Sequence, residues 1–485
     1  MDDLHELTAV DLRDRLRAGD LAPAEVAEHF LARIERLNPG LGAFTTVTAD
    51  GARERAQSLT RTAPVPSQVL WGLPLGDKDL WNRAGVPTGF GSRAFGGAHA
   101  FVPDVSDEIV TRLDDAGAVS LGKTAAPELG FPAYTELLAG PPARNPWDTS
   151  RGAGGSSGGA AVAVAAGLLP FAPGSDGGGS VRIPAAACGV VGLKPTRGLV
   201  PAGSGIDSLG GLVVAGPIAR TAADTALLLE GMITWGPDGE AAHPYTLRAP
   251  SARAGEYVAA ARTGDAPGGG PLRVAVTTSS AWDGFYDIAV SPEARAALDV
   301  GTTALAALGH DVEQIALEPA PEYGPAFRTL WMAGASSVPI DEPERLALLE
   351  PLTQWLIGKG REVAARRLAE ALRTLTAFER RLVAQVSAFD AVVTPALALT
   401  PRPLGWFDAE DAEHNFEQQC QYTPFTSMIN VAGLPALTVP THWTEDGLPM
   451  GIQLVGRPGG ERTLIALAAQ LEDRLGWPSR RPPAW

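Results

Sequence analysis

The chain has 485 residues, of which 45% are hydrophobic and 19% are charged, and its formal net charge is −16. This composition is typical of a globular protein with a large core, and the acidic balance argues against a nucleic-acid partner, which usually binds a basic surface. The charged amino-terminal segment does not resemble a secretory signal, and the longest apolar run, residues 160–173, is too short to span a bilayer, so we expect a cytoplasmic protein without a membrane segment.

The predicted elements begin with two helices in the first 60 residues, where apolar side chains recur at steps of three and four. Residues 38–40, Asn-Pro-Gly, are expected to end the second helix. A strand is predicted over residues 69–80, a helix over 107–117, a short strand over 118–124 and a helix from Ser157 to Leu169.

The second half continues the alternation. Residues 232–271 are interpreted as a long surface connection, and residues 340–388 as a helix-rich stretch. Further strands are predicted within 272–278, 389–397 and 435–443, and further helices over 291–310 and 461–475. Strands that alternate with helices indicate an α/β architecture with a largely buried, mixed sheet.

Lysine is rare in this chain. It occurs only at positions 78, 123, 194 and 359, although lysine and arginine together number 39. Where arginine is the default cation, each lysine is a candidate for chemistry that arginine cannot perform, because a buried lysine can lose its proton. The two cysteines, Cys188 and Cys420, are far apart, so we expect neither a zinc site nor a disulfide framework, and we interpret Cys188 as a core residue.

Two short motifs match known serine nucleophiles only in part. Residues 154–158 match the G-x-S-x-G elbow of α/β-hydrolases, but the preceding residues lack the strand that this turn requires, which favours a chance match. Ser120 to Lys123 matches S-x-x-K, but the companion K-T-G is absent and the serine falls inside a predicted strand, so we reject it.

The third candidate is the stretch GSDGGGS, residues 174–180. The backbone N–H groups of a glycine turn can converge on one point, and a nucleophile beside such donors is what acyl transfer needs. From these residues alone, a plain glycine loop is an equal alternative. A phosphate-binding loop is disfavoured, because no lysine follows and Pro184 stands where the next helix would have to begin.

Residues 154–198 resemble the signature sequence of the amidase signature family. GLPLGDKDL around Lys78 is similar to the family's lysine strand, and GAVSLGKTAAPELG, RNPWD and NVAGLPALTVP…DGLPMGIQLVG resemble other family segments. The likeness covers roughly residues 5–480 and is weakest over 235–390. It implies one α/β/α domain, residues 1–485, with a large mixed β-sheet covered by helices on both faces. Within it we distinguish N-terminal helices (1–60), the catalytic signature core (61–230), a variable, substrate-shaping region (231–390) and the C-terminal part of the core (391–485).

The resemblance also implies a Ser–cis-Ser–Lys triad that hydrolyses a linear or cyclic carboxylic amide through an acyl-enzyme, without a cofactor or metal. Ser180 would be the nucleophile, Ser156 the relay serine after a cis peptide bond, and Lys78 the general base. The physical chemistry agrees, since serine is a poor nucleophile until a neighbour takes its proton, and burial can lower the pKa of a lysine enough for this task.

By the same resemblance, the backbone N–H groups of Gly177, Gly178 and Gly179 would form the oxyanion hole. The family often has threonine where this chain has Gly177, and a small residue there is similar to the branch of cyclic nylon-oligomer hydrolases, so bulky or unnatural amides are plausible substrates. Phe131 falls where family members often line the substrate pocket and is our predicted substrate-binding residue, with core packing as the alternative.

Three charged residues flank these motifs. Asp77 precedes Lys78 where an apolar residue is usual, and alternation along a strand directs it away from that lysine. Asp176 and Arg182 flank the glycine turn, and we expect them to pair, with a surface role as the alternative.

The sequence leaves alternatives open for the activity, the partners and the roles of three aromatic residues. Esterase or aryl acylamidase activity, and an amidotransferase-type subunit that acts only with a partner, are the alternatives to a free-standing amidase. The expected partner is a small-molecule amide, and a homodimer is compatible with the sequence. Tyr323, Phe327 and Trp331, in the segment with the weakest likeness, could line the pocket or belong to the core.

Overall fold

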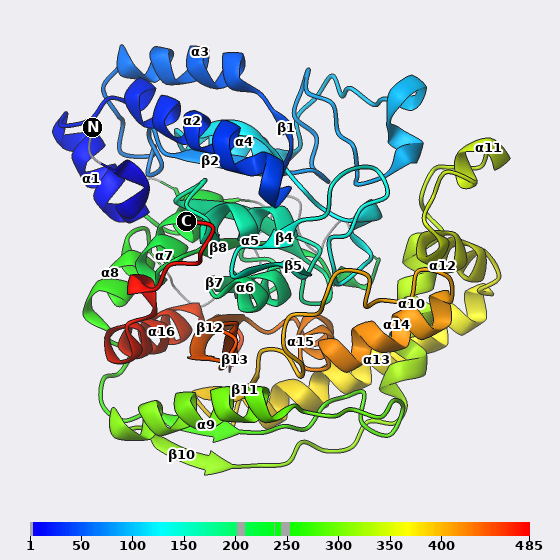
Figure 1. Ribbon diagram of the computed structural model, residues 1–485. Coiled ribbons are helices and arrows are strands. Elements are labelled where there is room, and N and C mark those ends of the chain that lie inside the picture. Colours follow the sequence, from blue (N-terminus) through cyan, green and yellow to red (C-terminus); the bar gives the residue numbers. More distant parts are fainter. Residues whose placement is uncertain (1–2, 201–208, 237, 244–252) are drawn as a thin grey trace.

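The computed structural model describes residues 3–200, 209–236, 238–243 and 253–485 (Figure 1). Their α-helices are α1 (Ala9–Ala18), α2 (Pro23–Leu41), α3 (Ala49–Thr60), α4 (Glu108–Asp115), α5 (Gly158–Ala165), α6 (Arg182–Cys188), α7 (Ala222–Met232), α8 (Glu256–Thr263), α9 (Pro292–Ala307), α10 (Tyr323–Ala335), α11 (Pro343–Leu346), α12 (Pro351–Arg361), α13 (Ala365–Val386), α14 (Ala412–Tyr422), α15 (Ser427–Ala432) and α16 (Glu461–Leu475). Their strands are β1 (Phe44–Val47), β2 (Pro74–Lys78), β3 (Val119–Thr124), β4 (Arg144–Asn145), β5 (Asp148–Gly152), β6 (Phe171–Asp176), β7 (Val191–Lys194), β8 (Val214–Ala219), β9 (Arg273–Val276), β10 (Asp311–Gln314), β11 (Ala391–Pro395), β12 (Ala436–Trp443) and β13 (Pro449–Gly456).

A mixed sheet of eight strands, in the order β10-β9-β11-β13-β12-β7-β8-β6, forms the centre of the molecule. β10, β9 and β11 run parallel to one another, and the remaining pairs are antiparallel. Helices cover both faces of this sheet. Side chains alternate between the two faces along each strand, so Gln453 of β13 contacts Arg182 of α6, whereas its neighbour Ile452 packs on Gly301 of α9. The predicted α/β/α fold with a large mixed sheet is thus confirmed (Figure 1).

A second, three-stranded sheet has the order β1-β3-β2, with β2 parallel to β3 and β1 antiparallel to it. Its strand β2 lies beside β6, one of the two edge strands of the large sheet. The predicted strand over 69–80 is shorter in the structure, because residues 69–72 form turns that include Gly72 at φ +76°. This arrangement brings Lys78, at the end of β2, next to the end of β6.

Helix ends differ from the sequence prediction at two places. Residues 38–40 do not end α2, which includes Pro39 and ends before Gly42, where φ is +64°. Conversely, α5 ends at Ala165 rather than Leu169, because Gly167 takes a left-handed conformation at φ +64°. In both cases a glycine with positive φ ends the helix, as is common.

The segment 232–271 is not only a surface connection. It contains α8, whose Tyr257 is buried, and the backbone N–H groups of Tyr257 and Val258 donate to the carboxylate of Glu230 on α7. Residues 244–252 of this segment lie outside the described part.

A helix also follows the glycine turn, against our expectation. Pro184 is the third residue of α6. Proline is tolerated in this first turn, because the first four N–H groups of a helix have no intrahelical acceptor. Pro184 therefore does not argue against a phosphate-binding loop. Whether the turn could bind phosphate depends on the charged groups and the backbone N–H groups within it.

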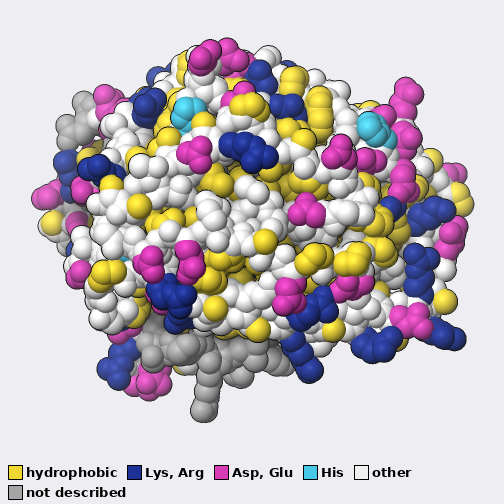
Figure 2. All heavy atoms as spheres, turned by 90° about the horizontal axis from the view of Figure 1, so that it is seen from below, with side chains coloured by type: hydrophobic (Ala, Val, Ile, Leu, Met, Phe, Trp, Pro, Cys, Tyr) yellow, Lys and Arg dark blue, Asp and Glu magenta, His cyan; other side chains and the backbone are white. Residues whose placement is uncertain are grey.

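The surface carries mixed charge. Figure 2, seen from below the view of Figure 1, shows acidic and basic side chains interspersed over one face of the molecule. The surface also carries ion pairs such as Arg273 with Glu313 and Arg366 with Glu370. In the described residues, no helix is both long and apolar enough to cross a membrane.

Candidate active site

Lys78 and Ser156 form a buried hydrogen-bonded pair. Lys78 Nζ donates to Ser156 Oγ at 2.8 Å, to Ser175 Oγ at 2.9 Å and to the Ser175 carbonyl at 3.2 Å. The backbone of Ser180 lies next to this pair, because the N–H of Ser157 donates to the Ser180 carbonyl at 3.0 Å. Within the described residues, no hydrogen bond joins the hydroxyls of Ser156 and Ser180.

Burial sets the protonation of Lys78. The side chain is fully buried between β2 and β6, and this desolvation lowers the pKa of Lys78 to about 7, although the charge of Asp176 acts in the opposite direction. A substantial fraction of this lysine is therefore neutral near pH 7 and able to accept a proton.

Asp77 points away from Lys78, as strand alternation predicts. Its Oδ2 accepts from Arg83 Nε at 2.6 Å and from Ser120 Oγ at 2.7 Å, and the side chain is fully buried. Because Arg83 neutralises this carboxylate on the other side of β2, Asp77 does not oppose the deprotonation of Lys78.

The peptide bond between Gly155 and Ser156 is cis, as the resemblance implies. A side chain at position 155 would not fit, because its Cβ would lie 2.7 Å from backbone atoms of Tyr134. This close approach orients Ser156 just before the start of α5.

The glycine turn after β6 requires glycine at one position. Gly179 has φ +129°, and a Cβ there would lie 2.5 Å from Thr426 Oγ1. Thr426 Oγ1 also donates to the Gly178 carbonyl at 2.6 Å, which fixes the orientation of that peptide. Gly177 and Gly178 do not have a positive φ, so their backbone conformations do not require glycine.

The carboxylate of Asp176 lies inside the turn. It accepts the N–H of Gly179 at 2.8 Å and that of Val181 at 3.2 Å. A phosphate would meet both this negative charge and amides that are already engaged, which argues against a phosphate-binding loop. Among the three predicted oxyanion donors, the Gly179 amide is thus shared with Asp176.

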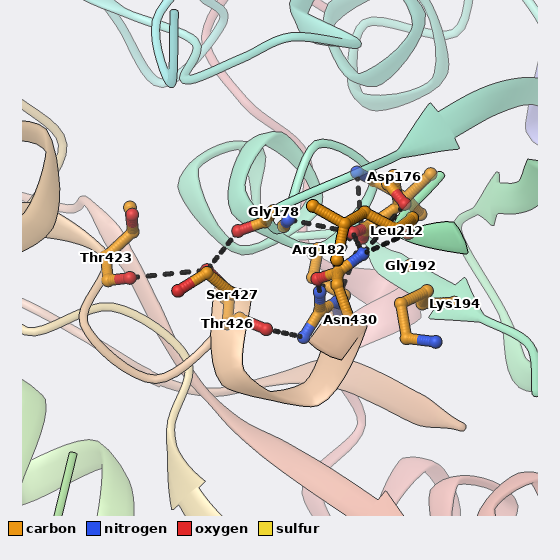
Figure 3. Close-up of polar contacts among 12 residues, drawn as sticks. Asp176, Gly178, Arg182, Gly192, Lys194, Leu212, Thr423, Thr426, Ser427 and Asn430 are labelled. Carbon is orange, nitrogen blue, oxygen red and sulfur yellow. Dashed lines mark hydrogen bonds and ion pairs between the residues drawn. The ribbon is translucent and has the colours of Figure 1, made fainter. Parts of the chain in front are cut away.

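Arg182 pairs with Asp176, as we expected. Arg182 Nε and Nη2 each lie 2.9 Å from a carboxylate oxygen of Asp176, and both side chains are fully buried. Arg182 also donates to the Thr426 carbonyl and to Asn430 Oδ1 (Figure 3). A further bond runs from Arg182 to Gln453 Oε1. The charge of Arg182 and its hydrogen bonds outweigh the effect of burial and hold the pKa of Asp176 well below its usual range.

Replacement of Arg182 with alanine is expected to lower the free energy of unfolding by about 3–5 kcal/mol, because it leaves the buried Asp176 carboxylate without its counter-ion. Denaturant unfolding followed by circular dichroism measures this loss. Arg366, 89% exposed and paired with Glu370 on the same helix, is the matched control, and its alanine variant should lose less than about 1 kcal/mol. Equal losses in the two variants would contradict the structural role of Arg182.

Ser180 opens into an apolar pocket. The residues that line it are Phe131, Pro132, Ala133, Gly178, Ser180, Ile183, Trp282, Phe327, Trp331, Phe416, Gln419, Cys420, Thr423 and Ser427. Phe131, the predicted substrate-binding residue, thus lies in the same pocket as Ser180, where its ring meets Trp331 edge-on at 6.0 Å.

The sequence leaves open whether Tyr323, Phe327 and Trp331 line the pocket or belong to the core, and the structure contains both cases. Phe327 and Trp331 line the pocket with stacked rings 5.6 Å apart, whereas Tyr323 is fully buried behind it and donates to Ser427 Oγ at 2.9 Å. Sequence reasoning missed the lining residues of α14 and α15, such as Gln419 and Ser427, since no local motif marks them. The only sequence signal near them is the segment NVAGLPALTVP, which resembles the family and begins a few residues later, at residue 430.

Cys188 is buried in the core, as predicted, and its Sγ lies 3.7 Å from the Ala153 carbonyl. Cys420 is buried as well, in the wall of the pocket. Across the described residues, no cluster of three or more His, Cys, Asp or Glu side chains could hold a metal ion.

The family described as "Amidase" matches residues 25–465. Among curated relatives, "Putative amidase AmiB2" of Mycobacterium tuberculosis is 37% identical over 472 residues, which cover 96% of each chain. A glutamyl-tRNA(Gln) amidotransferase subunit of Roseiflexus sp. (strain RS-1) is 34% identical over 507 residues, which cover 99% of this chain and 98% of the relative. Among solved structures, that of 6-aminohexanoate cyclic dimer hydrolase complexed with substrate has a TM-score of 0.87 and 30% identity, with all of both chains covered.

Proposed function

The chain belongs to the amidase signature family, and from this premise we propose that it hydrolyses a carboxylic amide through an acyl-enzyme on Ser180. One observation carries the proposal: a buried lysine with a pKa of about 7 donates to the hydroxyl of Ser156, beside the backbone of Ser180 and its apolar pocket. Such a lysine can act as a base near neutral pH, which arginine cannot do.

In the first half-reaction, Ser180 Oγ attacks the amide carbonyl carbon and forms a C–O bond. Its proton passes to Ser156 Oγ, and the Ser156 proton passes to neutral Lys78. The carbonyl π electrons move to the oxygen, which becomes an oxyanion. The C–N bond then breaks, and protonated Lys78 returns its proton through Ser156 to the leaving amine. Water repeats the sequence on the acyl-enzyme and releases the acid.

The oxyanion is expected to accept from the backbone N–H groups of the glycine turn, Gly177, Gly178 and Gly179. The hydrogen bond from Gly179 to Asp176 gives the first two amides the larger part of this role. Thr426 supports the turn, since its hydroxyl donates to the Gly178 carbonyl and lies against Gly179.

A labelling experiment with the purified chain alone tests the proposal. An alkyl fluorophosphonate should modify Ser180 and abolish hydrolysis of a simple aryl amide, with mass spectrometry locating the label. Turnover without any added protein would exclude a subunit that acts only with a partner, and a matched amide and ester compared on one enzyme would separate an amidase from an esterase. A label on Ser156 would overturn the assigned roles.

A further inference from the structure

The pocket beside Ser180 is uncharged. Its lining consists of aromatic and aliphatic side chains, backbone, and a few neutral polar groups. Asp176 and Arg182, which flank the glycine turn, are fully buried and pair with each other, and neither they nor Lys78 line the pocket. A charged group on a substrate would therefore lose water without gaining a counter-ion, which is costly in an apolar site.

The polar side chains of the wall are engaged with the protein. The Gln419 side chain accepts a backbone N–H and donates to Asn415 Oδ1 at 2.6 Å. Ser427 Oγ accepts from Trp282 Nε1 at 3.0 Å and from the Tyr323 hydroxyl at 2.9 Å. The bonds of Ser427 hold α15 against α10 and Trp282, and the bond from Ala133 holds α14 against the segment that carries Phe131. They leave apolar surface as the main contact that the wall offers to a substrate.

Trp331 shapes the space next to the glycine turn. A Cβ at Gly177 would lie 3.6 Å from Trp331 Cη2 and 3.0 Å from Val213 Cγ2, and a Cβ at Gly178 would lie 4.0 Å from Trp331 Cη2. The indole therefore lies directly against the turn where the family often has the side chain of a threonine. Its ring stacks on Phe327 and meets Phe131 edge-on, so it is fixed from two sides.

We propose that this pocket takes an uncharged, apolar acyl group, with flat aromatic rings preferred, and that Trp331 is the specificity-determining residue. This inference rests on the proposed amide hydrolysis at Ser180. A ring packed against Phe131 and Trp331 gains edge and face contacts that an aliphatic chain of equal size lacks. Free glutamine, with an ammonium and a carboxylate, does not fit such a pocket.

Matched primary amides test the charge preference, because each releases ammonia and differs only in the acyl end. Hexanamide should exceed both 6-aminohexanamide and the carboxylate adipamate in kcat/KM by at least about 100-fold. 3-Phenylpropanamide should exceed 3-cyclohexylpropanamide by about 3- to 10-fold. The same order is expected for the rate at which fluorophosphonates with these tails label Ser180, so the preference is measurable even where turnover is slow.

The two proposals fail differently. Absence of both labelling at Ser180 and ammonia release would overturn the amidase mechanism itself. Labelling of Ser180 at equal rates by charged and uncharged tails would overturn the neutral pocket and leave the mechanism intact.

Variants of Trp331 test its own role. Trp331→Ala should remove the preference for the phenyl over the cyclohexyl substrate by lowering kcat/KM most for the phenyl substrate, whereas Trp331→Phe should retain the preference. Trp235→Ala, at a tryptophan that packs in a different hydrophobic cluster, is the matched control and should change neither ratio. If Trp331→Ala lowers kcat/KM for all amides by the same factor, Trp331 has a structural role only.

Discussion

Replacement of Ser180 with alanine is expected to lower kcat/KM for any amide substrate by at least about 10⁴-fold, because the attacking oxygen is lost. The fold should remain intact. The contact that Ser180 makes with its neighbours is made by its backbone, whose carbonyl accepts from Ser157, and the alanine variant keeps this bond. The small side chain leaves no sizeable cavity when its oxygen is removed.

The measurement combines steady-state kinetics with thermal unfolding and fluorophosphonate labelling. Ser180→Ala should show neither turnover nor label, with a midpoint of unfolding within a few degrees of the parent protein. Ser150→Ala, at an exposed serine of β5, serves as control and should retain full activity. Near-normal turnover by Ser180→Ala would refute the nucleophile assignment.

Loss of Lys78 is expected to have an effect of similar size. Lys78→Ala should lower kcat/KM by at least about 10³-fold, and Lys78→Arg should not restore it, because arginine stays protonated and cannot accept a proton from Ser156. Hydroxide can partly replace the missing base, so the alanine variant should recover some activity at high pH.

The pH dependence of the parent enzyme follows from the same lysine. Burial lowers the pKa of Lys78 to about 7, and only the neutral form can act as base. Activity should therefore fall as pH drops below about 7 and reach a plateau above it, and Lys78→Ala should lack this inflection. Lys359, half-exposed and paired with Glu362, is the matched control, and its alanine and arginine variants should keep the parent profile. A parent profile without an inflection near pH 7 would contradict the role of Lys78.

Much of the candidate site could be predicted because its groups lie in contiguous motifs. The rarity of lysine directed attention to Lys78, and the glycine run directed attention to Ser180. Local alternation was enough to place Asp77 away from Lys78, and the opposite charges of Asp176 and Arg182 were enough to expect their pairing. The ion pairs of Asp77 with Arg83 and of Asp176 with Arg182 each join residues six positions apart, whereas the hydrogen bond from Lys78 to Ser156 spans 78 positions and is implied only by the resemblance to the family.

The helix ends and the wall of the pocket depend on backbone conformations and tertiary contacts that local sequence patterns do not predict. Pro39 and Pro184 both lie inside helices, because what ends α2 is the left-handed Gly42 and what permits Pro184 is its place in the first turn of α6. The wall of the pocket joins α10, α14 and α15, whose lining residues occupy positions about a hundred residues apart in sequence. Which of their aromatic side chains face Ser180 is decided by tertiary packing alone.

The proposed catalytic groups and most of the pocket wall come from different parts of the chain, and this affects how the substrate preference of the enzyme can evolve. The groups proposed for proton transfer and bond cleavage lie between residues 78 and 180, whereas most of the pocket wall is supplied by residues 282–427. Selection, natural or in a directed-evolution library, can therefore vary α10 and α14 for new substrates without altering the catalytic apparatus. The constraint on such a library is Arg182, whose bonds to Thr426, Asn430 and Gln453 fasten the two parts together, so these positions should be held constant.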